Sequence, residues 1–340
     1  MWGPDAYLEH LNEKAYKEYR KKTEESWLNR KSVVRTQLVK VLGGFPAEGG
    51  ALEPEVLERI EREDHVVERV AFSTEQNLRM LAYVLVPKGL KGKAPAVLAW
   101  HGHGHGSREV IGIRPDGSFD DSGAANPGHF ALELVRRGLI VVAPEIIGFG
   151  DRRLASDQAK DPTRNSSCAP LAARLLLHGK TLAGLRIYEA RRTLDYILTR
   201  SDVNTARIGC AGFSGGGLVA AFSAALDNRI QAVVLCAFTS TFRGSLLARG
   251  HCIDNYLPGM LSEADLPDLI GLTAPRSLFV ESGELDPLFP VDSVREAVRR
   301  LQEIYVQEEA EGRLQSDLFP GKHEVSGRAS FDWLANQLKA

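Results

Sequence analysis

Along most of this chain, short apolar runs alternate with longer segments in which apolar residues recur every three or four positions. The short runs predict buried strands, and the longer segments predict helices with one apolar face. From residue 95 onward the two kinds alternate, which is typical of a mostly parallel sheet with helices on both faces. The expected strands are 95–100, 139–144, 208–211, 232–237, 276–281 and 314–319. The expected helices are 127–138, 171–200 with a break at Gly179 or Gly184, 218–226, 290–307 and 324–339.

The N-terminal part of the chain has a different pattern. Residues 5–42 carry an apolar stripe that predicts an amphipathic helix, and Gly43 and Gly44 supply its stop signal. A second short helix is expected at 54–62. Because nothing in these segments suggests an independent core, we predict that residues 1–65 form a helical extension packed on the main body. The stripe consists of Trp27, Val34, Leu38 and Leu42.

Two further strands are expected between this extension and the alternating region. Residues 66–72 and 78–86 are rich in apolar and β-branched side chains, and the polar segment 73–77 separates them. This pattern predicts a β-hairpin. The hairpin and the alternating region together predict one α/β domain that spans residues 66–340.

The composition excludes several classes of function. The net charge is only −2, so nothing indicates binding to nucleic acid or to an anionic membrane. No apolar run reaches the length of a membrane span, and the first residues do not have the pattern of a secretory signal. The four cysteines show no C-x-x-C spacing, and Cys210 and Cys236 lie in expected core strands. We therefore expect free thiols in a cytoplasmic protein; the sequence does not determine the oligomeric state.

One glycine-rich segment has the pattern of a site for nucleophilic chemistry. Gly212-Phe-Ser-Gly-Gly216 matches G-x-S-x-G, with an apolar run before it and a run of small residues after it. In the arrangement strand, sharp turn, helix, this pattern exposes the serine hydroxyl at the end of a sheet. Ser214 is therefore the candidate nucleophile. The amide of Gly215, at the start of the helix, is a candidate donor to an oxyanion.

A nucleophilic serine needs a base and an acid that orients the base, and both follow later in the chain. Asp286 comes after the 276–281 strand, and His323 comes after the 314–319 strand. We expect His323 to accept the serine proton and Asp286 to fix the tautomer of the imidazole. Glu284 lies on the same loop, but Asp286 is preferred because Pro287 and Pro290 stiffen the chain beside it.

The segment Trp100-His-Gly-His-Gly-His-Gly106 follows the first parallel strand, and its glycines let backbone amides approach a ligand. The amide of His103 is the preferred second oxyanion donor, and that of Gly104 is the alternative. His101, His103 and His105 could instead bind a metal ion. We do not favour this, because the glycines leave the backbone flexible and no Asp, Glu or Cys nearby completes the set; no metal is expected.

Three polar segments interrupt the alternation, namely 107–126, 151–170 and 239–266. Long loops in a compact domain are usually functional or disordered, so we predict that these segments form the walls of a substrate pocket. Whether they also form a lid is left open. Glu145 follows the 139–144 strand and is expected to have a structural role, such as pairing with Arg152 or capping, rather than to line the pocket.

Together these residues resemble the α/β-hydrolase superfamily, and within it the serine esterases of the dienelactone hydrolase-like and acetyl xylan esterase-like groups. The resemblance implies an α/β-hydrolase fold and ester hydrolysis through an acyl-enzyme without a cofactor. Dienelactone hydrolases use a cysteine nucleophile, whereas this chain has Ser214, so their particular activity is not expected. The motifs that carry the resemblance are His101-Gly-His-Gly104, Pro144-Glu-x-x-Gly-x-Gly-Asp151, Gly184-Leu-Arg-x-Tyr188, the segment around Ser214, Asp286 and Pro320-Gly-x-His323.

The hypothesis drawn from the sequence is a carboxylic ester hydrolase that acts on a small-molecule ester. The expected pocket walls are polar, which favours a short acyl group on a hydrophilic alcohol such as a sugar. A serine peptidase or a thioesterase on the same fold is the alternative within enzymes. A binding module without activity is the alternative outside them, but such proteins usually lose a member of the triad, and none is missing here.

Overall fold

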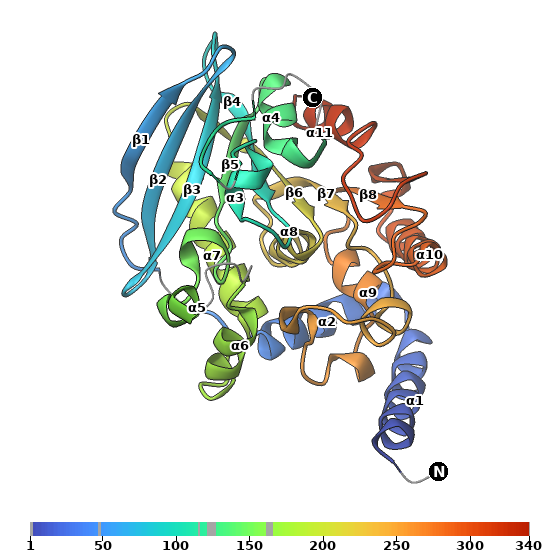
Figure 1. Cartoon of the computed structure of the whole chain (residues 1–340). Helices are drawn as coiled ribbons and strands as arrows, with labels where there is room; N and C mark the ends of the chain where they lie inside the picture. Colours follow the sequence, from blue (N-terminus) through green and yellow to red (C-terminus); the bar gives the residue numbers. More distant parts are fainter. Residues whose placement is uncertain (1–2, 47–48, 115, 121–126, 161–165, 340) are drawn as a thin grey trace.

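A nine-stranded sheet forms the centre of the molecule (Figure 1). The structure is a computed structural model, and it describes residues 3–46, 49–114, 116–120, 127–160 and 166–339. The strands are β1 (Glu55–Glu61), β2 (His65–Glu75), β3 (Leu78–Pro87), β4 (Ala94–Trp100), β5 (Ile140–Pro144), β6 (Val203–Phe213), β7 (Ile230–Cys236), β8 (Ser277–Gly283) and β9 (Leu314–Phe319).

The sheet is mostly parallel, as the alternating pattern predicts. Its strand order is β1-β2-β3-β5-β4-β6-β7-β8-β9. In this spatial order, β1, β2, β3 and β5 pair with their neighbours antiparallel. From β5 through β4 and β6 to β9, all neighbouring strands pair parallel. The chain crosses from β5 on one side of β4 to β6 on the other. In open α/β sheets, ligands bind outside the carboxyl ends of the strands at such a crossover.

Helices cover both faces of the sheet. The helices α4 and α11 pack with one apolar cluster, whereas α7, α8 and α10 pack with a second cluster on the opposite face. The helices are α1 (Pro4–Thr23), α2 (Trp27–Val41), α3 (Ser107–Val110), α4 (Phe130–Arg136), α5 (Ala155–Lys160), α6 (Cys168–Leu176), α7 (Leu182–Thr199), α8 (Gly215–Leu226), α9 (Leu266–Gly271), α10 (Val291–Gln307) and α11 (Ser330–Lys339).

The central strands are buried on both faces, which explains why they are continuous apolar runs in the sequence. In β4, Val97 and Ala99 point into the cluster under α4 and α11, whereas Leu98 and Trp100 point into the other cluster. This alternation follows from the two-residue repeat of a strand. Both layers of the core are therefore assembled around the same strand, directly before the His103 loop.

The predicted helix at 54–62 is wrong, because residues 55–61 form strand β1. Val56, Leu57 and Ile60 are spaced as on a helix, but this segment pairs antiparallel with β2 at the edge of the sheet. Backbone pairing with an otherwise free strand edge prevails here over local helix propensity. The many charged residues of β1 are typical of an edge strand that must not pair further.

The expected helix over residues 5–42 is divided into two. The helix α1 ends at Thr23 and α2 begins at Trp27. Helix α2 packs in the core through the predicted stripe, with Trp27 and Leu38 fully buried, whereas α1 extends away from the body (Figure 1). The division into an extension at 1–65 and a domain at 66–340 stays a prediction.

Other element boundaries are close to the expectation. The hairpin forms as β2 and β3, and the long helix breaks around Gly179, which has a φ of +66°, to give α6 and α7. The closing helix begins at Ser330 and not at residue 324, because an irregular segment follows β9. Over the described part of the chain, none of the helices combines the length and the apolar character of a membrane span.

Candidate active site

The candidate nucleophile lies between a strand and a helix. Ser214 joins β6 to α8 with φ 53° and ψ −118°, a strained backbone conformation for a residue with a side chain. Such a conformation costs about 1–3 kcal/mol and persists only where surrounding contacts hold it. Here the amide of Ser214 donates to the carbonyl of Cys236 on β7 at 2.9 Å, and its carbonyl accepts from the amide of Gly217 at 2.8 Å.

The glycines of the motif are required by close packing, as expected. A Cβ on Gly216 would lie 2.1 Å from the carbonyl oxygen of Trp100, and one on Gly212 would lie 2.2 Å from that of Gly216. Both obstacles are backbone atoms that cannot rotate away. The turn therefore brings α8 so close to β4 and β6 that only glycine fits at either position.

Four parallel strands deliver the predicted site residues to one edge of the sheet. His103 follows β4, Ser214 follows β6, Asp286 follows β8 and His323 follows β9. The carboxyl ends of parallel strands lie at the same edge, so residues far apart in the sequence meet there. The tertiary fold thus brings all four sequence-predicted positions to one region.

Three of these residues form a continuous chain of hydrogen bonds. His323 Nε2 lies 2.9 Å from Ser214 Oγ, and His323 Nδ1 lies 2.8 Å from Asp286 Oδ2. The other carboxylate oxygen of Asp286 accepts from the amides of Leu288 at 2.8 Å and Phe289 at 3.1 Å. The buried carboxylate is thereby held in one orientation, and in turn it orients the imidazole.

The second carboxylate of the same loop points elsewhere. Glu284 is exposed and pairs with Arg295 at 3.3 Å. It is therefore engaged at the surface, and Asp286 alone of the two contacts His323. The role of Asp286 as the acid stays a prediction.

Glu281 is a supporting residue that the sequence analysis missed. It is buried on β8, and its carboxylate accepts from the amides of Ser326 and Gly327 and from the hydroxyl of Ser330. These contacts fix the segment that follows His323. A glutamate inside an apolar strand signals a buried hydrogen-bonded role, and this signal was present in the sequence.

Gly215 and His103, whose amides are the predicted oxyanion donors, lie next to each other. Gly215 is the first residue of α8, and the imidazole of His103 packs against its Cα, because a Cβ there would lie 2.9 Å from the ring. The loop that carries His103 is anchored by His101, whose Nε2 accepts from the amide of Ile146 at 3.0 Å. His101 Nδ1 lies 2.7 Å from the carbonyl oxygen of Gly102.

A small cavity of about 200 Å³ opens beside Ser214. Four of its residues come from the 239–266 segment, which is thus one of the predicted walls. Of the other two segments, the described parts supply no lining residue of this cavity, while 115, 121–126 and 161–165 lie outside the described residues. The lining residues are His103, Ser214, Gly215, Gly250, His251, Cys252, Asn255, Leu288 and Phe289.

His251 is a second residue of the cavity that the sequence did not single out. Its Nε2 lies 2.9 Å from Ser245 Oγ, and its ring packs edge-on against Phe289, which also stacks on His323. Burial, and then the nearby His323, lower the pKa of His251 below its usual value. A largely neutral imidazole therefore faces the cavity beside the hydrogen-bonded chain.

An apolar pocket of about 200 Å³ adjoins this cavity and shares Asn255 with it. The 239–266 segment is consequently less polar on its inner side than its composition suggests. Several of its leucines and aromatic residues are buried here, and its two arginines are exposed, whereas the carboxylates of Asp254 and Asp265 are also buried. The pocket residues are Phe242, Leu246, Leu247, Asn255, Tyr256, Leu257, Pro258, Met260 and Leu261.

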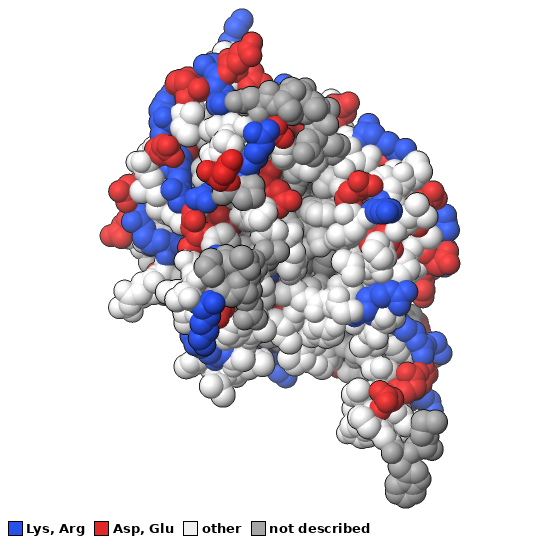
Figure 2. Space-filling model, viewed as in Figure 1, with Lys and Arg blue, Asp and Glu red and all other residues white. Residues whose placement is uncertain are grey.

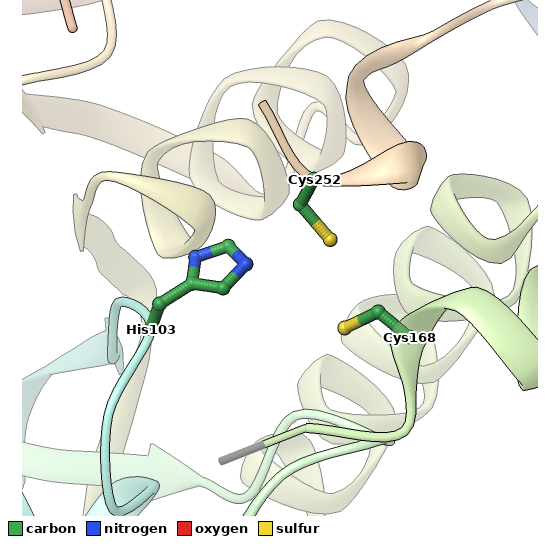
Figure 3. A group of neighbouring side chains, drawn as sticks. All are labelled: His103, Cys168 and Cys252. Carbon is green, nitrogen blue, oxygen red and sulfur yellow. The ribbon is translucent and has the colours of Figure 1, made fainter. Parts of the chain in front are cut away.

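A group of metal-binding side chains meets at the cavity, but not the group considered from the sequence. The donor atoms of His103, Cys168 and Cys252 all lie within 4.8 Å of one another (Figure 3). The expectation that no cysteine lies near His103 is therefore wrong. Both ring nitrogens of His101 are engaged with the backbone, so the three alternating histidines do not converge.

The two cysteines of this group differ in acidity. A hydrogen bond from Cys252, supported by His103 and Arg186, outweighs burial and lowers the pKa of Cys168 to about 3. The same contact raises the pKa of Cys252. The contact therefore favours the thiolate at Cys168 and the thiol at Cys252.

Glu145 has the structural role that was expected, with a different partner. Its carboxylate accepts from the amide and the hydroxyl of Ser107 at 3.0 and 2.9 Å, at the start of α3. Arg152 donates instead to the backbone carbonyl of Glu145 and pairs with Glu189. Glu145 Oε1 also lies 3.3 Å from His101 Nε2, so Glu145 links β5 to the loop after β4 through both Ser107 and His101.

The mostly parallel sheet, its helical layers and the strained serine turn between β6 and α8 define the fold as that of an α/β-hydrolase. The sequence profile of the Abhydrolase family matches residues 6–304. This chain therefore belongs to the Abhydrolase family. The matched range includes the N-terminal helices.

Known proteins similar to this chain agree with that assignment. YtaP of Bacillus subtilis (strain 168), a proposed hydrolase, is 31% identical over 281 residues, which cover 80% of this chain and 86% of YtaP. A proposed acetyl xylan esterase from Bacteroides fragilis NCTC 9343 has a TM-score of 0.75 at 18% identity, with 92% of this chain and 88% of that chain covered. A glucuronoyl esterase from Solibacter usitatus has a TM-score of 0.68 at 16% identity, with 92% of each chain covered. At such identities the two structural likenesses establish the fold alone.

Proposed function

We propose that this protein is a serine carboxylic ester hydrolase. The observation that carries the proposal is the chain of hydrogen bonds from Asp286 through His323 to Ser214, with the serine on a strained turn. Each contact has the length that a nucleophile, its base and an orienting acid require. The membership of the Abhydrolase family supports the same chemistry.

In the proposed reaction, Ser214 Oγ attacks the acyl carbon of the ester while His323 Nε2 takes its proton. Asp286 holds the proton on Nδ1 and stabilises the imidazolium. The amides of Gly215 and His103 would donate to the oxyanion of the tetrahedral intermediate. His323 then protonates the leaving alcohol, and an acyl-enzyme forms on Ser214. Water, activated by His323, releases the acid and restores the serine.

For the substrate, we propose a short acyl group, acetyl-like, on a hydrophilic alcohol such as a sugar. The cavity of about 200 Å³ is smaller than most ligand pockets, which are roughly 300–1,000 Å³. Two imidazoles and Asn255 provide polar groups at its wall. The proteins of similar fold include a proposed acetyl xylan esterase and a glucuronoyl esterase, whose names also point to esters of carbohydrates.

The test is the loss of ester hydrolysis in Ser214→Ala. The variant should lower kcat by about 10⁶-fold, as removal of a nucleophilic serine does elsewhere, and it should leave the thermal unfolding midpoint close to that of the parent. Ser240→Ala is the control, because the Ser240 hydroxyl is buried and contacts Ser293 rather than a histidine. A fluorophosphonate probe should label Ser214 alone. Retained hydrolysis in Ser214→Ala, or labelling at Ser240 or Ser245, would refute the assignment.

A further inference from the structure

Three segments that are distant in the sequence bring soft metal ligands together beside Ser214. His103 lies on the loop after β4, Cys168 is the first residue of α6, and Cys252 precedes the short helix η4 (Ile253–Asn255). Their donor atoms lie within 4.8 Å of one another. Figure 3 shows that the imidazole and both sulfur atoms point into one common space.

The sulfur of Cys168 is held by a buried hydrogen-bond network. Arg186 Nη2 donates to Cys168 Sγ at 3.2 Å and to the carbonyl of Ile147 at 2.9 Å. The guanidinium is fully buried and pairs with the buried carboxylate of Asp254. Because Asp254 neutralises this arginine, the network presents an N–H donor to the sulfur without a net positive charge. Such partners behind a ligand orient it in known metal sites.

We propose that His103, Cys168 and Cys252 bind one thiophilic divalent cation, Zn²⁺, in a tetrahedral site whose fourth position is open. With Zn–S and Zn–N bonds of about 2.3 and 2.0–2.1 Å, tetrahedral ligand atoms lie about 3.5–3.8 Å apart. No separation in this group exceeds 4.8 Å. Side-chain rotations that shorten these separations by roughly 1 Å would bring all three donor atoms to tetrahedral zinc-ligand distances.

The charges of the ligands match this cation. A neutral imidazole and two thiolates compensate the two positive charges of Zn²⁺. Binding displaces the thiol proton of Cys252, and that of any protonated Cys168, into solvent. No oxidant or further reactant is needed. This set of one histidine and two cysteines with an open position is one of the ligand sets that bind zinc at reactive sites.

The open position faces the cavity with the candidate nucleophile. His103 is exposed and Cys252 is half-buried, and both line the cavity that contains Ser214. Solvent can therefore deliver the ion. A bound ion would occupy part of the space for the acyl group, so Zn²⁺ should inhibit hydrolysis; this consequence, unlike the metal site itself, rests on the proposed function.

The experiment is a titration of the full-length, reduced protein with Co²⁺, which replaces Zn²⁺ in such sites and reports sulfur ligation by its charge-transfer absorption. We expect one equivalent to bind, and we expect Zn²⁺ to displace it. Cys168→Ser and Cys252→Ser should each weaken Co²⁺ binding by more than about 100-fold. Loss of a residue that only hydrogen-bonds a ligand costs about 10–100-fold, so a larger loss indicates direct ligation. His103→Asn should weaken binding without abolishing the charge-transfer band.

The double variant Cys210→Ala/Cys236→Ala is the matched control, because it removes the two strand thiols and keeps the proposed ligands. It should bind Co²⁺ like the parent. Thermal unfolding of each variant identifies any that is misfolded. Where a Cys→Ser variant is misfolded, Cys→Ala at the same position is tested in its place. Absence of the charge-transfer band in the parent, or unchanged Co²⁺ affinity in both single cysteine variants, would overturn the site. If hydrolysis is never detected but the band follows the pattern above, the metal site stands and the proposed function fails.

Discussion

At the residue scale, the site depends on how one carboxylate is held. Both carboxylate oxygens of Asp286 are engaged: one lies within hydrogen-bond distance of His323 Nδ1, and the other accepts hydrogen bonds from two backbone amides. Those amides fix the orientation of the carboxylate. Glu284 has no comparable support, because its carboxylate pairs with Arg295 at the surface. Two carboxylates on one loop therefore have different roles, set by their hydrogen bonds.

We predict that Asp286→Asn lowers kcat for ester hydrolysis by about 10⁴-fold. An amide in this position donates to Nδ1 and leaves His323 in the wrong tautomer to accept the serine proton. Steady-state kinetics on a short ester measures the effect. Glu284→Gln is the matched control and should cost less than about tenfold, because only a surface ion pair is lost. A larger loss in Glu284→Gln than in Asp286→Asn would assign the acid to Glu284.

At the scale of elements, helix α2 is part of the core. Trp27 is fully buried, and its indole Nε1 donates to Glu308 Oε1 at 3.0 Å. Its backbone amide donates to the side chain of Gln307 at 2.7 Å, so α2 begins against the end of α10. Helix α1, by contrast, buries only Tyr16 among its described residues. The two N-terminal helices therefore contribute unequally to stability.

Trp27→Ala should lower the free energy of unfolding by about 3–5 kcal/mol, the usual cost of removing a large aromatic side chain from a core. Urea denaturation followed by circular dichroism measures the change. Leu28→Ala, one position away on the exposed side of α2, is the control and should stay within about 0.5 kcal/mol of the parent. Equal effects of the two substitutions would show that α2 is not anchored in the core.

At the scale of the whole molecule, the cavity beside Ser214 is bounded by the 239–266 segment and by the loop after β8. Charged side chains lie mainly around the rim of the face seen in Figure 2, and uncharged residues predominate around its centre. The small cavity limits the acyl group. The adjoining apolar pocket shares Asn255 with this cavity.

We predict that kcat/KM on p-nitrophenyl esters is highest at about two to four acyl carbons and falls beyond. A longer chain gains about 0.8 kcal/mol per methylene only where apolar surface receives it, and a cavity of 200 Å³ offers little. Acetylated sugars should be deacetylated, and peptide amides should not be cleaved. Leu288→Ala enlarges the cavity and should move the maximum to longer chains. A maximum at long chains in the parent would refute the short-acyl substrate class.

The sequence by itself determined the alternating architecture and the order of the candidate residues. Apolar runs separated by amphipathic segments specify strands and helices, because burial repeats with the geometry of each element. The serine turn was predictable as well, since Gly212 and Gly216 mark a close approach of backbones that no other residue permits. The choice of Asp286 followed from the loop that carries it.

Only the tertiary structure decided which distant segments meet. Residues 55–61 become a strand because β2 offers a free edge, and nothing within the segment itself encodes that edge. The approach of Cys168 and Cys252 to His103, and the apolar inner side of the 239–266 segment, depend likewise on how loops fold over the sheet. Periodicity along a chain reports the environment of each element, whereas contacts between loops carry no periodic signal. For that reason the chain predicted its hydrogen-bonded serine site but not its cysteine pair.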